Sequence, residues 1–359
     1  MKLIVQPADG TAPLVKAIKQ AKKSVQIVIF RFDLTEIERA LEEAAERGVM
    51  VHALIAFTNR GGEKNLRKLE MRFLEKGIVV ARTANDLVRY HGKMMIVDGK
   101  DLYLLTYNFT RLDLRSRSFG IITRNRDLVQ EAIRLFEADT ARQPYTSRCS
   151  KFVVSPVNAR KRLAQFIKGA KRELLIYDVD VADKEMLRLL EERCQAGVSI
   201  KIIGHVSSSK YLAAREFRRL RLHTRVIIRD CKQVFLGSQS LRKLELNARR
   251  EIGMIVNNAK IISSMTTVFE DDWKASVPGN LKAEKKRASA LASRAAKKIV
   301  PAVEKKLAPR PVVKQVLKTL EQEASLEIDP SLAERVVKGT LKKAMKKATE
   351  KIIEKAVGQ

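Results

Sequence analysis

Apolar residues in this chain of 359 residues fall into short runs separated by amphipathic helical patterns. Residues 24–30 (SVQIVIF) form one such run, which is typical of a strand buried between helices. Residues 34–48 (LTEIERALEEAAERG) follow with an acidic amphipathic pattern that ends in Gly48, a common helix C-cap. Residues 49–56 (VMVHALIA) are apolar again. The pattern predicts a strand, a helix and a second strand.

The same order returns later in the chain. Residues 173–177 (ELLIY) predict a strand, 183–197 (DKEMLRLLEERCQAG) a helix ending in Gly, and 198–204 (VSIKIIG) a further strand. The two halves close with the similar segments LFEADT and VFEDDW. Because the order of elements repeats over more than about a hundred residues, we expect an α/β protein built from two similar units.

A pattern of polar residues sits on one of these apolar runs. Residues 90–108 (YHGKMMIVDGKDLYLLTYN) contain His91, Lys93 and Asp98 in the spacing His-x-Lys-x4-Asp. Side chains two residues apart on a strand share a face, so His91 and Lys93 are expected side by side. Residues 94–97 predict a buried strand, Asp98 and Gly99 a turn, and 102–105 the next strand.

The pattern is duplicated. Residues 222–240 (LHTRVIIRDCKQVFLGSQS) place His223, Arg225 and Asp230 at the same spacing, with apolar residues 226–228 as the matching strand. A His two residues from a Lys is common by chance, whereas the full spacing on a buried strand is much rarer. Two such triplets, on matching strands of a duplicated unit, indicate a functional pair.

The doubled motif resembles that of the phospholipase D superfamily over residues 14–273. The resemblance implies two phospholipase D-like α/β/α halves packed on each other, each giving one motif to a shared site. We expect the halves at 1–147 and 148–275, followed by a basic helical C-terminal tail at 276–359.

The resemblance also implies roles for individual residues. His91 is expected to attack a phosphodiester and form a covalent phosphohistidine, with His223 as general acid and base. Lys93 and Arg225 are expected to hold phosphoryl oxygens. The other expected catalytic residues are Asp98, Asp230 and Glu251, of which Glu251 corresponds to a carboxylate that orients a histidine and the two aspartates fit a bracing role at turns. The expected phosphate-binding residues are Thr106, Asn108, Ser238 and Ser240.

Several positions depart from the family pattern, in which the motif continues into Gly-Ser-x-Asn. The first half lacks that Gly and the second lacks that Asn, with Ser240 in its place. Arg225 replaces Lys, and Ser118 stands where the first half is expected to have a carboxylate. These departures leave open an alternative in which the protein is a catalytically degenerate binding protein.

The net charge of the chain indicates which substrates it can attract. The chain has 71 Lys and Arg against 41 Asp and Glu, a formal net charge of +30. This charge suits an anionic membrane surface or a nucleic acid. We expect a phosphodiesterase that hydrolyses or transfers a phospholipid head group, with a metal-independent nuclease as the alternative. The aromatic content of 5% argues weakly against recognition of single strands by base stacking.

No metal or cofactor is expected, since the mechanism needs none and His52 and His205 show no metal-ligand spacing. Three scattered cysteines, no signal peptide and no apolar stretch of about 18 residues favour a cytoplasmic protein without an integral membrane segment, peripheral to the membrane at most. The Lys- and Ala-rich tail fits a helix on anionic lipid, a nucleic-acid arm or a helix docked on the body.

The approach to the site is expected to vary between the halves. Residues 58–65 (TNRGGEKN) predict a loop before a helix that ends at Gly77, and we expect substrate contacts there. The second half has a segment about fifteen residues shorter in the same place. Residues 141–159 are expected to be a linker between the halves.

Overall fold

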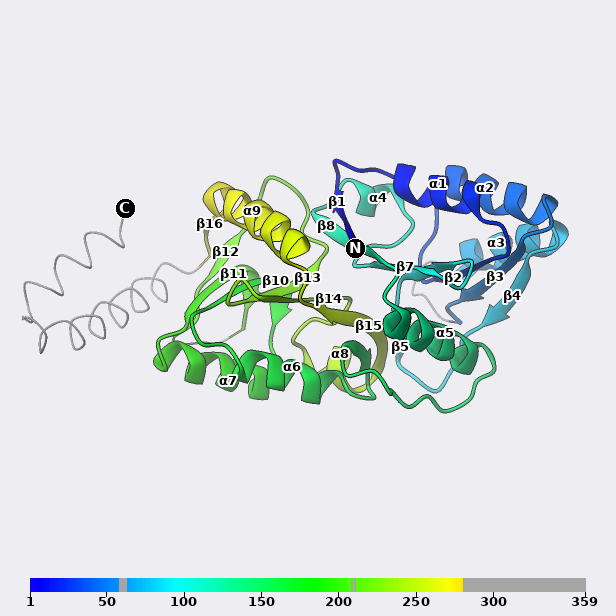
Figure 1. The fold of residues 1–359 in the computed structure, drawn as a ribbon. Helices are drawn as coiled ribbons and strands as arrows, with labels where there is room; N and C mark the ends of the chain where they lie inside the picture. The colour runs from blue at the N-terminus through cyan, green and yellow to red at the C-terminus, as the bar shows by residue number, and fades with distance from the viewer. Residues whose placement is uncertain (58–62, 208, 210, 280–359) are drawn as a thin grey trace, which may run out of the picture. The chain divides into compact units, whose positions relative to one another are not determined.

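The computed structural model describes residues 1–57, 63–207, 209 and 211–279, and residues 1–280 form one compact unit (Figure 1). Most of the expected tail, and residues 58–62 of the expected substrate loop, lie outside the described residues. Within them the chain forms two α/β halves, each a sheet with helices on both faces (Figure 1).

The first half is built on a seven-stranded sheet in the order β1-β8-β7-β6-β2-β3-β4. Its strands are β1 (Lys2–Gln6), β2 (Ser24–Ile29), β3 (Met50–Ile55), β4 (Val79–Arg82), β6 (Met94–Val97), β7 (Asp101–Leu105) and β8 (Ser118–Thr123). Its helices are α1 (Ala12–Gln20), α2 (Thr35–Glu46), α3 (Glu63–Glu75), α4 (Arg111–Leu114) and α5 (Arg126–Thr140). Helices α1 and α2 cover one face, and α5 covers the other (Figure 1).

The second half repeats this plan. Its sheet runs β16-β12-β11-β10-β13-β14-β15-β5, and β9 also pairs with β15. The strands are β5 (Arg89–Tyr90), β9 (Phe152–Ser155), β10 (Glu173–Val181), β11 (Ser199–Val206), β12 (Ala214–Glu216), β13 (Arg225–Arg229), β14 (Gln233–Gly237), β15 (Arg249–Val256) and β16 (Val277–Pro278). The helices are α6 (Ala159–Lys168), α7 (Lys184–Gln195), α8 (Lys243–Asn247) and α9 (Ala259–Ala275).

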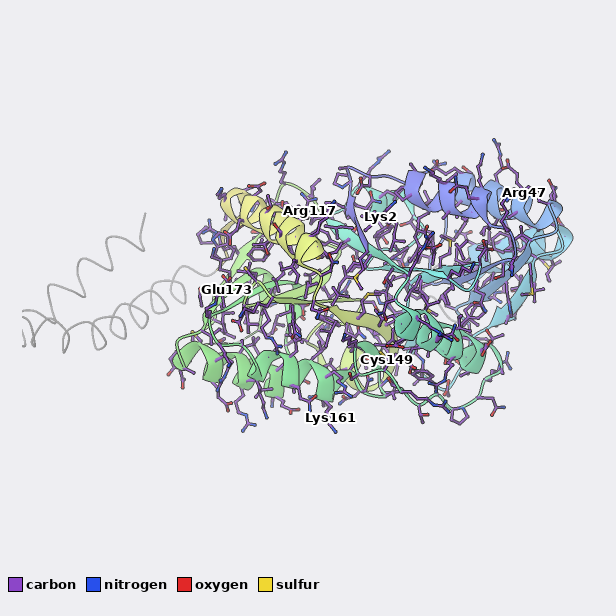
Figure 2. All side chains as sticks on the ribbon, viewed as in Figure 1. Lys2, Arg47, Arg117, Cys149, Lys161 and Glu173 are labelled. Carbon is purple, nitrogen blue, oxygen red and sulfur yellow. The ribbon has the colours of Figure 1, made fainter. Side chains whose placement is uncertain are left out.

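The described residues form three apolar cores, and side chains fill the space between the layers (Figure 2). One core joins the two halves: it combines Phe30, Met94 and Phe119 with Tyr177 and Val226, and includes residues of α5 and α9. The second lies between the first sheet and α1, α2 and α3, and the third between the second sheet and α6 and α7. Since burial of apolar area is the main favourable term in folding, the shared core makes the halves mutually dependent.

The predicted elements match the structure closely, apart from local differences. Residues 63–65, expected in a loop, instead open helix α3. The expected linker at 141–159 contains β9, whose four residues pair antiparallel with β15. Strand β5 belongs to the first half of the sequence but pairs in parallel with β15 of the second sheet. The pairing of β5 carries the chain across to the other half directly before His91.

Candidate active site

His91 lies between β5 and β6, where the chain returns from the second sheet to the first. The sequence predicted a strand here, but residues 91–93 are irregular because the backbone N–H of His91 donates to the carbonyl of Arg250 in the other half, at 2.7 Å. The His91 ring is buried and meets Phe30 edge-on, with ring centroids 4.8 Å apart. The histidine is thus placed by both halves.

Glu251 of β15 orients the His91 ring. Nδ1 of His91 lies 2.8 Å from Oε2 of Glu251, which is fully buried. Because a carboxylate only accepts hydrogen bonds, Nδ1 carries the proton and the lone pair is left on Nε2. Lys93 Nζ lies 2.8 Å from that Nε2 and 3.0 Å from Nδ1. The expected His91–Lys93 adjacency is therefore present.

His223 occupies the matching position in the second half. Its backbone N–H donates to the carbonyl of Arg117 at 3.0 Å, and its Nδ1 lies 3.3 Å from Oδ1 of Asp113 on α4, close enough for an ion pair but without hydrogen-bond geometry. Asp113 is buried and accepts hydrogen bonds from the backbone and side-chain amides of Asn108 and from Arg221. As in His91, the carboxylate approaches Nδ1, so Nε2 of His223 is on the side of the ring away from it.

Asp113 is not among the residues predicted from the sequence, whose pattern places the first-half carboxylate at Ser118. Ser118 is buried on β8, and its hydroxyl lies 3.5 Å from the carbonyl of Asp113. The signal that could have found Asp113 was present: it follows Asn108 by five residues, as Glu245 follows Ser240. The duplication therefore marks a second pair of acidic positions.

Arg225 is held by the residues that follow its neighbouring strand. Its Nε donates to Ser240 Oγ at 2.9 Å, its Nη2 lies 3.9 Å from Glu245, and Glu245 accepts the backbone N–H of Ser240. The Arg225 side chain is buried, and its Nη1 has no hydrogen-bond partner among the described residues. Nη1 is thus a buried donor available to an anion.

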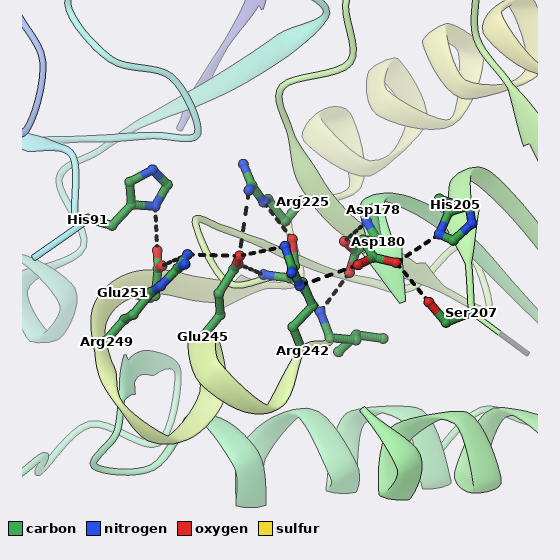
Figure 3. A network of polar contacts seen from close by, with 12 residues as sticks. His91, Asp178, Asp180, His205, Ser207, Arg225, Arg242, Glu245, Arg249 and Glu251 are labelled. Atoms are coloured by element: carbon green, nitrogen blue, oxygen red, sulfur yellow. Dashed lines mark hydrogen bonds and ion pairs between the residues drawn. The ribbon is translucent and has the colours of Figure 1, made fainter. Parts of the chain in front are cut away.

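Polar contacts join His91, Glu251 and Arg225 in one continuous network (Figure 3). Arg249 lies 3.1 Å from Glu245 and 3.9 Å from Glu251, so it links the partner of Arg225 to the partner of His91. The network runs on from Glu245 through Arg242 to Asp180 and His205 (Figure 3). Charges in the site are therefore paired across the second half rather than isolated.

The environment shifts the ionisation of the central groups. Burial lowers the pKa of His91 and of His223 well below their ordinary 6.5, and the Lys93 and Arg225 charges lower both pKa values further. Burial also lowers the pKa of Lys93, to about 7. Asp113 opposes the shift at His223, while the pKa of Glu251 is raised by burial. Without a bound anion, both imidazoles are neutral at pH 7.

The two motif aspartates lie at the other end of their strands. Asp98 accepts backbone N–H groups of Lys22, Lys23 and Ser24 at the start of β2, and Asp230 accepts the matching groups at the start of β10. Both residues have positive φ, 53° and 54°. They brace turns, as the sequence indicated, and we keep them outside the proposed catalytic group.

The hydroxyls of two residues expected to bind phosphate are already hydrogen-bonded to the backbone. The Thr106 hydroxyl donates to the carbonyl of Phe119 and accepts its N–H, and Ser238 makes the same pair of bonds with Ile252. These hydroxyls fasten β7 to β8 and β14 to β15. Asn108 and Ser240, in contrast, hold Asp113 and Glu245 in place and so bear on the site indirectly.

The family follows from comparison with known proteins. The family model described as "Cardiolipin synthase, PLD-like domain" matches residues 14–140 and 163–273, well over half of the chain. The chain belongs to the phospholipase D superfamily. The two matched segments carry the two motifs, one in each half.

Curated proteins with similar sequences are named polyphosphate kinase. A polyphosphate kinase of Pseudomonas aeruginosa is 25% identical over 56% of this chain and 32% of its own length, and one of Prosthecochloris aestuarii is 24% identical over 76% and 44%. The chain therefore spans less than half the length of these superfamily relatives.

Solved structures share the fold. Polyphosphate kinase from Porphyromonas gingivalis superposes with a TM-score of 0.64 at 21% identity, covering 76% of this chain and 50% of that one. Phosphatidylserine synthase from Haemophilus influenzae superposes with a TM-score of 0.60 at 11% identity, covering 78% and 87%. Both place this chain in the same two-halved architecture.

Other expectations concern metals, thiols and membranes. In the part of the chain that the structure describes, no three His, Cys, Asp or Glu side chains gather as a metal site would require. The three cysteines, all within described residues, are free thiols. None of the described helices combines the length and apolar character needed to cross a membrane.

Proposed function

We propose that this protein is a phospholipase D-type enzyme that breaks a phosphate ester bond in two steps through a phosphohistidine on His91. The observation that carries the proposal is the crosswise pairing of the histidines. Nδ1 of His91 faces Glu251 from the second half, and Nδ1 of His223 faces Asp113 from the first. Each pairing turns Nε2 away from the carboxylate. Lys93, whose Nζ lies 2.8 Å from Nε2 of His91, would shift to the phosphoryl oxygens as that Nε2 attacks, with Arg225 as the second cation.

The first step forms the intermediate. Nε2 of His91 attacks phosphorus, the N–P bond forms, and the bond from phosphorus to the leaving oxygen breaks as His223 gives that oxygen its proton. Lys93 and the Nη1 donor of Arg225 stabilise the charge that builds on the other oxygens. Since His223 enters this step protonated, the negative charge of the substrate supports catalysis by raising its pKa on binding.

The second step regenerates the enzyme. His223 takes a proton from water or from an acceptor alcohol, whose oxygen attacks phosphorus while the N–P bond breaks. Water gives hydrolysis, and an alcohol gives transfer. Both outcomes use the same side chains in the same positions.

Our first candidate substrate is a phospholipid, whose head group is hydrolysed or transferred. The description of the matched family model, which names cardiolipin synthase, supports this choice. The net charge of +30 supports it further, because it draws the protein to anionic lipid surfaces.

A second candidate is phosphoryl transfer involving a polyphosphate chain. It is supported by the sequence relatives named polyphosphate kinase. The same net charge suits a linear polyanion. The histidine chemistry is common to both candidates. They differ in the bond that breaks, a phosphate ester or a phosphoanhydride, and in the group that His91 receives.

Turnover by histidine variants tests the proposal. Wild type, His91→Ala and His223→Ala are assayed in EDTA on bis-p-nitrophenyl phosphate, phosphatidylglycerol vesicles, inorganic polyphosphate and supercoiled plasmid. We expect turnover of the generic diester and of one natural class, and a loss of at least about a thousandfold in kcat for each variant. The control is His52→Ala, because His52 lies on β3 and packs against Phe136 rather than in the site. Full activity of His91→Ala, or no turnover of any substrate by wild type, overturns the proposal.

A further inference from the structure

Two ion pairs with buried aspartates are linked to the backbone of His91 and His223. In the first, Arg250 of β15 donates from Nη2 to Oδ1 of Asp139 on α5 at 2.9 Å, and from Nη1 to the carbonyl of Ser155 at 3.2 Å. Tyr90, the residue before His91, donates its hydroxyl to Oδ2 of the same carboxylate at 2.8 Å. Arg250 and Asp139 are 9% and 7% exposed, so the pair is shielded from water.

The second ion pair repeats this arrangement with the halves exchanged. Arg117, labelled in Figure 2, donates from Nε and Nη2 to Asp272 on α9 at 2.7 and 3.1 Å, and from Nη1 to the carbonyl of Gln6 at 2.8 Å. Tyr177 donates its hydroxyl to Asp272 at 2.7 Å. Asp272 is 3% exposed.

Each ion pair is coupled to one histidine through the backbone. The carbonyl of Arg250 accepts the N–H of His91, and the carbonyl of Arg117 accepts the N–H of His223. Arg250 also directly precedes Glu251, the carboxylate on the His91 ring. Each arginine belongs to one half, while its aspartate and the histidine it supports belong to the other.

We propose that Arg250–Asp139 and Arg117–Asp272 are two crosswise clamps that position His91 and His223, respectively, for the chemistry proposed above. The inference rests on that proposed function. The four residues do not touch the reacting atoms: they are positioning residues that act through the backbone of the histidine.

The geometry explains why a clamp of this kind is needed. A His ring anchored only at Nδ1 still moves with its backbone, and a misplacement of about 1 Å can cost about a hundredfold in rate. Each arginine guanidinium binds a carboxylate and a backbone carbonyl, which fixes the position of its own backbone. The histidine N–H is hydrogen-bonded to that backbone. Because the planar fork of Arg makes these contacts together, Lys cannot replace it without loss of position.

Selective NMR of the imidazoles tests the clamps independently of turnover. The chain has four histidines, so ring-labelled histidine gives four sets of signals, with exposed His205 as reference. We expect Asp139→Asn to shift the ring signals of His91 and not those of His223. Asp272→Asn is expected to do the reverse. On bis-p-nitrophenyl phosphate, each variant is expected to lower kcat at least about tenfold while KM changes less than about threefold.

Milder variants and a matched control separate positioning from general destabilisation. Arg250→Lys and Arg117→Lys keep the charge and are expected to give the same selective shifts in smaller degree, should an Asn variant not fold. The control is Glu131→Gln, because Glu131 is a buried carboxylate on α5 that also binds an arginine and a tyrosine hydroxyl, yet is not bonded to a histidine.

Two results overturn the clamps: unchanged His91 and His223 signals in the folded clamp variants, or equal shifts at both histidines in Glu131→Gln. If the selective shifts appear but wild type turns over no substrate, the clamps stand and the proposed function fails. If wild type turns over and the signals do not move, the reverse holds.

Discussion

At the scale of single residues, the duplicated motifs have diverged into complementary parts. The first half supplies Lys93 and the second Arg225. Glu251 orients His91, while the equivalent position, Ser118, has lost the carboxylate and Asp113 serves His223 instead. The apparent losses in the motifs therefore do not leave either histidine without an acidic partner.

Lys93 gives the site a pH dependence that can be measured without turnover. Burial lowers its pKa to about 7, so the free site loses this cation as pH rises through 7. Sulfate keeps its charge over this range, and its Kd is expected to rise roughly tenfold between pH 6 and pH 8, because only charged Lys93 binds it strongly. Calorimetric titration with sulfate measures the change.

Lys93→Arg is the matched control, because Arg stays charged throughout this range. Burial also raises the pKa of Asp178 to about 7. Asp178 is unchanged in the variant, so its titration contributes equally to both profiles. The difference between the two pH profiles thus isolates Lys93. Identical profiles would contradict the role of Lys93 as the titrating anion ligand.

At the scale of elements, each motif strand has a residue of the proposed site at its start and a structural aspartate at its end. Lys93 and Arg225 stand where β6 and β13 begin, and Asp98 and Asp230 stand where these strands end. Each aspartate accepts N–H groups from three consecutive residues that open a neighbouring strand. The repeated spacing thus fits both the proposed chemistry and sheet assembly.

Asp230→Ala is expected to lower the free energy of unfolding by about 2–4 kcal/mol, since it leaves three partly buried N–H donors without an acceptor. The kcat of the folded variant is expected to stay within about twofold of wild type. Asp98→Ala is expected to cost less, because Asp98 is less buried than Asp230 and its hydrogen bonds to Lys22 and Lys23 are solvent-exposed. Urea unfolding and turnover give the two quantities; lost activity with unchanged stability would return these aspartates to the catalytic group.

Much of the fold was predictable from these elements, and less of the site. Apolar runs and Gly-capped helical patterns identified β2, α2, β3 and their repeats because each is set by local periodicity. Strands β5 and β9 were missed, since two and four residues carry little periodicity and both form by pairing with β15. Asp113 was missed for a related reason: its contact with His223 crosses between the halves, and only their packing creates it.

At the scale of the whole molecule, each half completes the site of the other. The ring partner, the backbone partner and the clamp arginine of each histidine all come from the opposite half. The shared apolar core holds these groups in register. A duplicated fold therefore yields one site with two unlike histidines, where an isolated half would lack the groups that orient its own.

The measurement that tests the central claim most directly is the trapping of the covalent intermediate. His223→Ala is mixed with bis-p-nitrophenyl phosphate, whose p-nitrophenolate leaves without a proton, so the first step proceeds while the second is blocked. We predict a burst of about one p-nitrophenolate per protein and a p-nitrophenyl phosphoryl group on the peptide containing His91, absent from a variant that also carries His91→Ala. A burst without an adduct on His91, or an adduct on another residue, would contradict the account.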